Sequence, residues 1–557
     1  MPLSFKSYLG YDALTQALRE LSEAHPKLAR LESVGKSHEG RDLWLVTITN
    51  SATGPDLEKP AFWLDGNIHS VELAASMACL YTVNALLTQY GSDEQVTRLL
   101  DRMAFYILPR LNPDGVELAL GKPPRYVRSG VRPYPFADED DGLQPEDVDG
   151  DDRVLTMRFE DPTGPWKASE KDARAMIRRG PDEEGGTYYR LFPEGRVRNY
   201  DGWVVRLARS RQGLDFNRNF PAIWEGEGSQ KGAGPYPLSE EETRAVARFI
   251  SEHPNLTGAI TYHTSGGIHL RPLSFKPDDE LPAEDLWIYR LIGRRATELT
   301  GYPAVSLYHD FRYHPKEVMT GAFDDWMYDT LGVWAWTTEL WDLVGRATGK
   351  TDRKQIEWYR DHPEEDDLAI LRWDDEQNGG RGFVPWYPFQ HPELGRVELG
   401  GWDRLYSWTN PPPELLEEEV AKNHRFALAQ AGMAPRLEVL EATATPLGGN
   451  RYRVRLVVQN SGFLGTYVSR RAEERKAVRP LRIELEGAEV LTGERRLEAG
   501  QLEGRSNKLD WLSNSNTDNR LRREWVVEAE PGSQLTIHVL SQRAGTLHLK
   551  VALPKPR

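Results

Sequence analysis

The sequence contains a single cysteine, Cys79, among 557 residues, so a disulfide bond within the chain is excluded. Cys79 falls in an apolar, helix-like stretch, where a lone cysteine is typical of core packing. Long hydrophobic runs are also absent, because no window of about eighteen apolar residues occurs. We therefore expect no membrane-spanning segment and no membrane partner.

Positive charge is scarce as well. The 70 basic residues are outnumbered by 85 acidic ones, which gives a net charge of −15. A nucleic-acid-binding surface would need basic patches, so we expect no nucleic-acid partner. The N-terminus lacks a basic region followed by an apolar one, which predicts a cytoplasmic protein, or a secreted one if a leader has been removed. The sequence does not define the oligomeric state.

Helix-like and strand-like segments alternate from about residue 8 to 434. Helical spacing of apolar residues marks residues 11–24, 239–253 and 283–301. The strand-like segments are residues 41–50, 61–66, 103–111, 256–264 and 333–340. This alternation predicts an α/β fold with a mixed, mostly parallel sheet and helices on both faces.

Two changes of character divide the chain, which is too long for one ordinary core. Residues from about 116 to 212 are rich in Pro, Gly and charge, which predicts a large insertion over one end of the sheet. From residue 435 the chain shows alternating strands bounded by Gly, Asn, Ser and Pro. We therefore predict an α/β domain at residues 1–434 and an all-β sandwich at residues 435–557.

Three residues with metal-binding side chains follow predicted strands. His69 and Glu72 lie one helical turn apart after the strand "AFWLDG", and His263 ends the strand "LTGAITYHT". Open α/β sheets collect ligands at the carboxyl ends of their strands, so these side chains are expected to meet. Two histidines and one glutamate form a common ligand set of catalytic zinc.

Two further motifs supply candidate groups for catalysis and substrate binding. Glu339 ends the strand "VWAWTTEL", where a carboxylate buried among Trp and Thr could act as a general base. "NPDG", residues 112–115, predicts a turn that closes the strand before it. "GLDFNRNFP" places Asn217 and Arg218 in a loop, and an arginine can hold a carboxylate through two parallel hydrogen bonds.

Taken in order, HxxE, NPDG, DFNRNF, His263 and Glu339 resemble the zinc metallocarboxypeptidase family, which includes the pancreatic carboxypeptidases and their bacterial relatives. The resemblance runs from about residue 8 to the "ELWD" segment. It implies a carboxypeptidase-like catalytic domain at residues 1–434. It also implies one Zn²⁺ per chain and a peptide substrate with a free C-terminus.

The resemblance also assigns roles to individual residues. His69, Glu72 and His263 correspond to the zinc ligands, and Glu339 to the base that activates water. Asn217 and Arg218 correspond to the pair that holds the terminal carboxylate. "RYVRSGVR" repeats an Arg-x-x-Arg step, so Arg128 corresponds to the arginine that stabilises the oxyanion. The alternatives are that Arg128 is a solvated loop charge and that Arg158 takes this role.

The sequence departs from the family at two positions and is informative at a third. Val71 stands where the family often has arginine, so one secondary substrate contact is expected to be lost. Glu317 stands where the family has a mobile tyrosine; Tyr313 and Tyr308 are the nearby candidates, and we take Tyr313. Asp324 occupies the family's specificity position, where aspartate implies a preference for C-terminal Lys or Arg. The alternative is that Asp324 faces away or bonds to the backbone.

An acidic loop follows within the predicted insertion. Asp147, Asp149 and Asp151 alternate like the start of a calcium loop, although the later positions of such a loop are not matched, so Ca²⁺ binding and a solvated loop both stay open.

Two rival functions stay open beside the carboxypeptidase. One rival function keeps the fold but hydrolyses cell-wall peptides or glutamyl side-chain amides. The other rival, disfavoured by the complete ligand set, is a non-catalytic binding protein.

Overall fold

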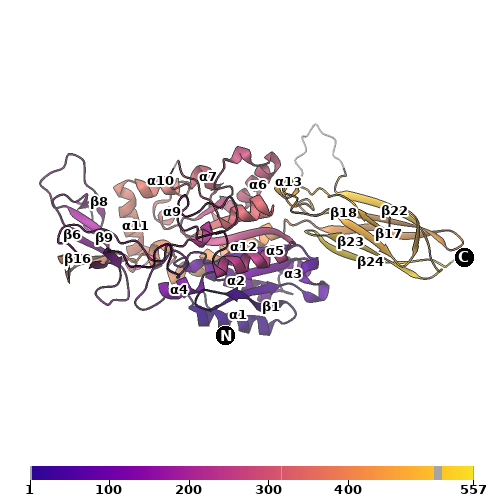
Figure 1. The fold of residues 1–557 in the computed structure, drawn as a ribbon, viewed down its shortest axis with the longest axis horizontal. Helices are drawn as coiled ribbons and strands as arrows, with labels where there is room; N and C mark the ends of the chain where they lie inside the picture. Colours follow the sequence, from indigo (N-terminus) through magenta and orange to yellow (C-terminus); the bar gives the residue numbers. More distant parts are fainter. Residues whose placement is uncertain (1–2, 315, 507–516, 556–557) are drawn as a thin grey trace.

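A computed structural model describes residues 3–314, 316–506 and 517–555. The molecule is elongated, with an α/β body between a small β-sheet at one end and a β-sandwich at the other (Figure 1). Within the described ranges, no helix combines the length and the apolar character needed to cross a bilayer.

An eight-stranded mixed sheet forms the centre of the body. In order across the sheet its strands are β1 (Ala29–Lys36), β2 (Asp42–Ile48), β4 (Ala104–Leu108), β3 (Ala61–Gly66), β11 (Leu256–Thr264), β14 (Trp334–Leu340), β12 (Ile268–Arg271) and β13 (Ala304–Ser306). The four strands β4, β3, β11 and β14 run parallel to one another. They are buried along their whole length, which explains their continuous apolar sequences.

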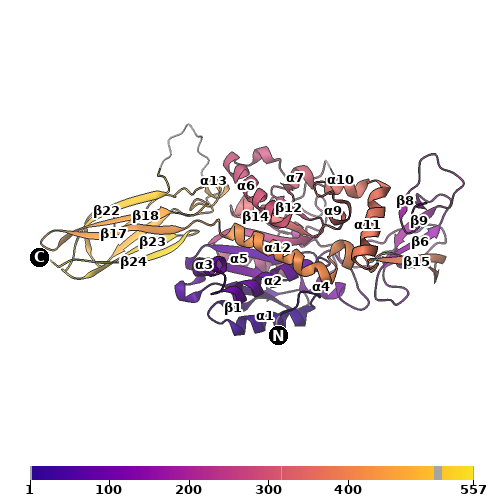
Figure 2. The same ribbon diagram turned by 180° about the vertical axis from the view of Figure 1, so that it is seen from behind.

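Helices cover both faces of this sheet (Figure 2). Alternate residues of β3 point into two cores, Phe62 and Leu64 into one and Trp63 into the other. The first core is covered by α1 (Tyr11–Ala24), α2 (Leu73–Gln89), α3 (Glu94–Arg102), α6 (Ala283–Thr300) and α12 (Pro413–Ala431). The second core is covered by α5 (Glu241–Glu252), α8 (Phe323–Asp325) and η5 (Trp326–Thr330). The predicted α/β fold is therefore confirmed.

The segment predicted as an insertion contains strands of its own. A six-stranded sheet has the order β15 (Phe383–His391), β16 (Gly395–Trp402), β6 (Thr156–Glu160), β9 (Tyr189–Pro193), β7 (Trp166–Ala168) and β8 (Met176–Arg178). Next to it, β5 (Gly142–Pro145) pairs with β10 (Gly195–Arg198). Two strands of the larger sheet come from after residue 382, so the inserted sheet is completed by a distant part of the chain.

Further helices connect these parts. They are α4 (Pro113–Ala119), α7 (Leu307–Asp310), α9 (Leu343–Thr348), α10 (Gln355–Arg360), α11 (Glu364–Gln377) and α13 (Arg470–Glu474). The NPDG motif does not form the isolated turn predicted from its sequence. Instead Asn112 caps α4 by accepting the Gly115 N–H at 3.0 Å, with Pro113 in the first helical turn.

The C-terminal region consists of two antiparallel sheets around one apolar core, as predicted. One sheet has the order β17 (Leu437–Gly448), β18 (Arg451–Asn460), β22 (Arg520–Glu528) and β20 (Glu489–Thr492). The other has the order β21 (Arg496–Glu498), β19 (Arg482–Glu486), β23 (Gln534–Ser541) and β24 (Gly545–Ala552). Along β18 every second residue is buried, which matches the alternating pattern of its sequence.

Candidate active site

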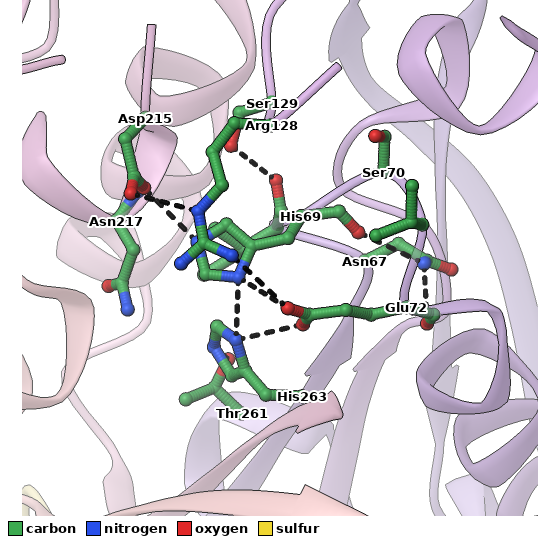
Figure 3. Close-up of polar contacts among 12 residues, drawn as sticks. Asn67, His69, Ser70, Glu72, Arg128, Ser129, Asp215, Asn217, Thr261 and His263 are labelled. Carbon is green, nitrogen blue, oxygen red and sulfur yellow. Dashed lines mark hydrogen bonds and ion pairs between the residues drawn. The ribbon is translucent and has the colours of Figure 1, made fainter. Parts of the chain in front are cut away.

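Three side chains converge where β3 and β11 end (Figure 3). The Nδ1 atoms of His69 and His263 lie 3.0 Å apart. Glu72 places one carboxylate oxygen 2.8 Å from His69 Nδ1 and the other 3.0 Å from His263 Nδ1. All three residues are buried. The structure therefore brings together the three residues predicted as metal ligands.

The turn between β3 and α2 sets this geometry. Asn67 donates its side-chain N–H to the carbonyl of Glu72 at 2.7 Å, which closes the turn. Asn67 itself has a φ of 56°, a conformation that asparagine tolerates better than most residues. Gly66 is required because a Cβ there would lie 2.7 Å from the Ala75 backbone in α2. This close approach holds the helix start against the strand end.

Two further residues orient the histidines, and sequence reasoning assigned a role to neither. Asp215 accepts a hydrogen bond from His69 Nε2 at 3.1 Å. Thr261 places its hydroxyl 3.4 Å from His263 Nε2 and donates it to Asp65 at 2.7 Å. Burial raises the pKa of Asp215, but Arg128 and His69 outweigh it and hold that pKa well below its ordinary value. The carboxylate of Asp215 therefore stays ionised beside His69.

Glu339 lies beside His263, because β14 and β11 pair in parallel with these two residues in register. Its carboxylate lines the same pocket as His69 and His263. Burial raises the pKa of Glu339 to about 8, an effect that His263 opposes and Glu72 reinforces. A carboxylate with a raised pKa in a pocket fits a group that accepts and returns a proton.

Arg128 lies next to the cluster, and its side chain is 44% exposed. Its Nε is 3.2 Å from an oxygen of Asp215, and its Nη1 is 3.6 Å from an oxygen of Glu72. The loop is held in place because Ser70 N–H donates to the Arg128 carbonyl at 3.0 Å. The alternative candidate, Arg158, bonds to Glu398 in the inserted sheet and does not line this pocket.

Asn217 and Arg218 also line the pocket, from the short helix η3 (Phe216–Arg218). Asn217 accepts the Phe323 N–H at 2.9 Å through its side-chain oxygen. Arg218 is buried, and it donates to the Asn217 carbonyl at 2.8 Å and contacts the Met319 sulfur at 3.1 Å. Among the described residues, no carboxylate forms an ion pair with Arg218. A buried guanidinium without an acidic partner calls for a negatively charged ligand.

Comparison with known proteins decides the family. The model described as zinc carboxypeptidase matches residues 14–140 and 182–348, more than half of the chain. The chain belongs to the zinc carboxypeptidase family. Residues 436–552 match a second model, described only as a domain of unknown function.

Individual relatives are distant. Mast cell carboxypeptidase A of Mus musculus is 24% identical over 343 residues, which cover 59% of this chain and 62% of that protein. Carboxypeptidase B of Astacus astacus is 24% identical, with 61% of this chain and 88% of that protein covered. A crystal structure of thrombin activatable fibrinolysis inhibitor is 18% identical, with a TM-score of 0.44, covering 77% and 74% of the two chains. The chain spans about half to three fifths of the length of the first curated relatives it matches.

The residues present fit the zinc ion that the family name implies. Two imidazole nitrogens and a carboxylate face a common point, with their ligand atoms within 4.8 Å of one another. The other ring nitrogen of each histidine lies next to Asp215 or Thr261, the arrangement that fixes the tautomer of a ligating histidine. His69, Glu72 and His263 would therefore hold the zinc ion.

Asp324 lines the pocket beyond the zinc site and is 1% exposed. One carboxylate oxygen accepts the Asp325 N–H at 3.0 Å, and the other has no hydrogen-bond partner of normal geometry among the described residues. The Thr337 hydroxyl is close enough to favour the charged form. Backbone bonding therefore satisfies only half of the group. Burial raises the pKa of Asp324 above its ordinary value. The surrounding wall is largely apolar, with Leu270, Leu307 and Met319.

Tyr313 lies in the wall of the pocket and is half exposed, whereas Tyr308 does not line it. Glu317, at the family's tyrosine position, is exposed and also lies outside the pocket wall. The space left between the lining side chains is about 30 Å³, enough for roughly one water molecule.

The acidic loop is occupied by protein partners. Asp147 accepts the N–H groups of Gly150 and Asp152 at 2.6 and 2.8 Å. Asp149 accepts the hydroxyl of Tyr387, and Asp151 binds the guanidinium of Arg153. The three carboxylates lie close together, but nothing in these contacts supports the Ca²⁺ ion that the sequence left as one of two possibilities.

Proposed function

We propose that this chain is a zinc-dependent carboxypeptidase that removes single amino acids from the C-terminus of peptides. The observation that carries the proposal is Arg218, a buried guanidinium that makes no ion pair with a described carboxylate, in the same pocket as His69, His263 and Glu339. It supplies a binding site for a carboxylate beside a hydrolytic centre.

The chain's own residues have distinct roles in this reaction. When bound, zinc polarises the scissile carbonyl and lowers the pKa of a water molecule. Glu339 takes a proton from the attacking water and returns it to the departing amine. Arg128, beside the metal ligands, stabilises the charge that develops on the carbonyl oxygen. Asn217 and Arg218 hold the terminal carboxylate and so fix which bond is cleaved.

We further propose a preference for C-terminal lysine or arginine. The unpaired oxygen of Asp324 supports it, because a buried carboxylate is costly unless a cation pairs with it. The apolar wall formed by Leu270, Leu307 and Met319 suits the aliphatic stem of such a side chain. The same carboxylate argues against the rival glutamyl substrates, whose acidic groups would be repelled.

The proposal is tested with peptides that end in free Lys, Arg, Phe, Leu or Glu, compared with C-terminally amidated copies. We expect release of Lys and Arg from the free-carboxylate peptides only, and none from Glu339→Gln. Asp324→Asn is expected to lower kcat/KM for Lys and Arg substrates by about 100-fold, the range for breaking a buried charge pair. Asp352→Asn, at an exposed site, is the matched control.

Preference for Phe or Leu would retain the enzyme and refute the role of Asp324. If zinc-loaded protein cleaved none of these peptides, the result would favour the alternative function, hydrolysis of cell-wall peptides or glutamyl side-chain amides. Absence of stoichiometric zinc from the purified protein would instead favour a non-catalytic binding protein.

A further inference from the structure

A second cavity, of about 390 Å³, lies between α10, α11, the inserted sheet and the helix η6 (Leu405–Thr409). Seven aromatic residues line it and define what we call the aromatic cavity: Trp166, Trp358, Tyr359, Phe383, Trp386, Trp402 and Trp408. Five of the 17 tryptophans of the chain are thus gathered at one cavity. Such a concentration of rings around a space of ligand size is typical of a binding site.

The aromatic cavity is built from parts of the chain that the family does not share. All of its lining residues except Leu191 fall outside residues 14–140 and 182–348. Both ribbon views place α10 and α11 between the central sheet and the inserted sheet (Figures 1 and 2). The cavity therefore exists only because the insertion and the segment after residue 348 pack together.

Its walls are attached directly to the ends of the two catalytic strands. Gln355, at the start of α10, donates to the carbonyl of Gly266 at 2.5 Å, three residues after His263. Gly266 N–H donates to the carbonyl of Trp341 at 2.8 Å, two residues after Glu339. The Trp341 ring N–H donates to a carbonyl of η6, that of Ser407, at 2.7 Å. Helices α10 and η6, which supply residues to the aromatic cavity, are thus hydrogen-bonded to the segments that directly follow His263 and Glu339.

The charge at the cavity indicates what else it binds. Arg174 is neutralised by Asp172 and Asp375, at 2.8 and 2.7 Å. Arg404 also lines the cavity and is exposed, and it makes no ion pair with any carboxylate in the described parts of the chain. Asp367 also lines the cavity, but it pairs with His362 at 3.1 Å. Among the described lining residues, Arg404 is thus the charged group without a salt bridge, and beside the rings it selects an aromatic group with an acidic neighbour.

We propose that the aromatic cavity is a binding site for the upstream part of the peptide substrate. It takes an aromatic side chain that lies several residues before the scissile bond, while an adjacent Asp or Glu pairs with Arg404. This inference rests on the proposed peptidase function, because it assigns the cavity to the same peptide that occupies the zinc site. Binding at two points would tether longer substrates and raise their kcat/KM above that of short ones.

Direct binding provides a test that does not depend on activity. The probes are fluorescein-labelled, C-terminally amidated octapeptides that carry the pair Trp-Glu at successive positions. Metal-free protein is titrated into each peptide, and the affinity measured by fluorescence anisotropy is compared with that of an octapeptide that carries Ala-Ala instead. We expect one Trp-Glu register to bind most tightly, and Tyr359→Ala and Arg404→Ala each to weaken it about tenfold. Trp203→Ala removes a ring that is 89% exposed and lies outside the cavity, so it serves as the control.

Kinetics separate failure of this inference from failure of the proposed function. Zinc-loaded protein is given two substrates, the Trp-Glu octapeptide with a free C-terminus and an N-terminally blocked dipeptide. The ratio of kcat/KM for the octapeptide to kcat/KM for the dipeptide is expected to be about tenfold lower in Tyr359→Ala than in wild type. Hydrolysis of both substrates with equal binding of Trp-Glu and Ala-Ala peptides would overturn the inference and leave the peptidase intact. Tyr359-dependent binding without hydrolysis of any peptide would support the cavity as a peptide site and refute the peptidase. Binding of a neutral oligosaccharide, together with no binding of any of the peptides, would overturn the assignment to peptides.

Discussion

At the scale of single residues, Asp215 connects the metal site to the oxyanion site. One of its oxygens bonds His69 Nε2 and the other lies 3.2 Å from Arg128 Nε. A ligating histidine that is bonded in this way keeps its tautomer and ring orientation, and its basicity rises. Asp215 therefore acts as a positioning residue for two groups of the site at once.

Replacement of Asp215 by Asn is expected to weaken zinc binding by about 10- to 100-fold, the usual cost of losing such a partner. Competition with a chromophoric chelator measures this affinity without reference to turnover. Asp182→Asn, at an exposed position, should leave it unchanged. Wild-type zinc affinity in Asp215→Asn would show that the carboxylate does not orient His69.

At the scale of elements, the sequence predicted the residues that follow strands and missed those that depend on distant pairing. His69, His263 and Glu339 were placed correctly because each ends or follows a continuous apolar strand. Asp215 gave no such signal, since it lies in a loop and its partner His69 is 146 residues away. The inserted sheet was missed for a similar reason. Its strands β6, β7, β8 and β9 are three to five residues long, and Arg158 of β6 pairs with Glu398 of β16, which lies far along the chain.

Helix α5 carries a buried acid that makes stability depend on pH. Glu242 is 1% exposed, one oxygen accepts the His38 N–H at 2.9 Å, and the other has no partner among the described residues. Burial raises the pKa of Glu242 to about 7, above its ordinary value near 4.5. The folded state thus favours the protonated acid. Its contribution is complete below pH 4.5 and is lost as the pH rises through 7.

Glu242→Gln keeps the acceptor oxygen and removes the charge. The variant is expected to match wild type near pH 5 and to exceed it in stability by up to about 3 kcal/mol at pH 8. Thermal unfolding of both proteins from pH 5 to pH 8 measures the difference, with exposed Glu241→Gln as the control. A constant difference in Tm across this range would contradict the raised pKa.

At the scale of the whole molecule, the β-sandwich is docked onto the α/β body through a buried arginine. Arg543 is 3% exposed and donates to the carbonyls of Leu331, Gly332 and Pro254, at 2.5, 3.2 and 3.4 Å. Nearby, Ser469 donates its hydroxyl to the same Gly332 carbonyl at 2.7 Å. Burial of Arg543 lowers its pKa to about 10. The guanidinium thus satisfies carbonyl groups that would otherwise be left without donors.

Arg543→Ala should therefore loosen the sandwich from the body, at a cost of about 2 to 4 kcal/mol for the unsatisfied carbonyls. Limited proteolysis is expected to cut the chain between the two parts faster in this variant. Thermal unfolding should separate into two transitions. Arg496→Ala, whose side chain is exposed on β21, is the matched control. Proteolysis and unfolding identical to wild type would show that Arg543 does not hold the parts together.

The most direct test of the account compares one peptide ending in free lysine with its C-terminal amide, using wild type and Arg218→Met. We expect wild-type kcat/KM to favour the free acid strongly, and Arg218→Met to lower this preference by about 100-fold or more. Exposed Arg206→Met should retain it. Equal hydrolysis of the acid and the amide by wild type, or an unchanged preference in Arg218→Met, would contradict the claim that Arg218 binds the substrate's terminal carboxylate.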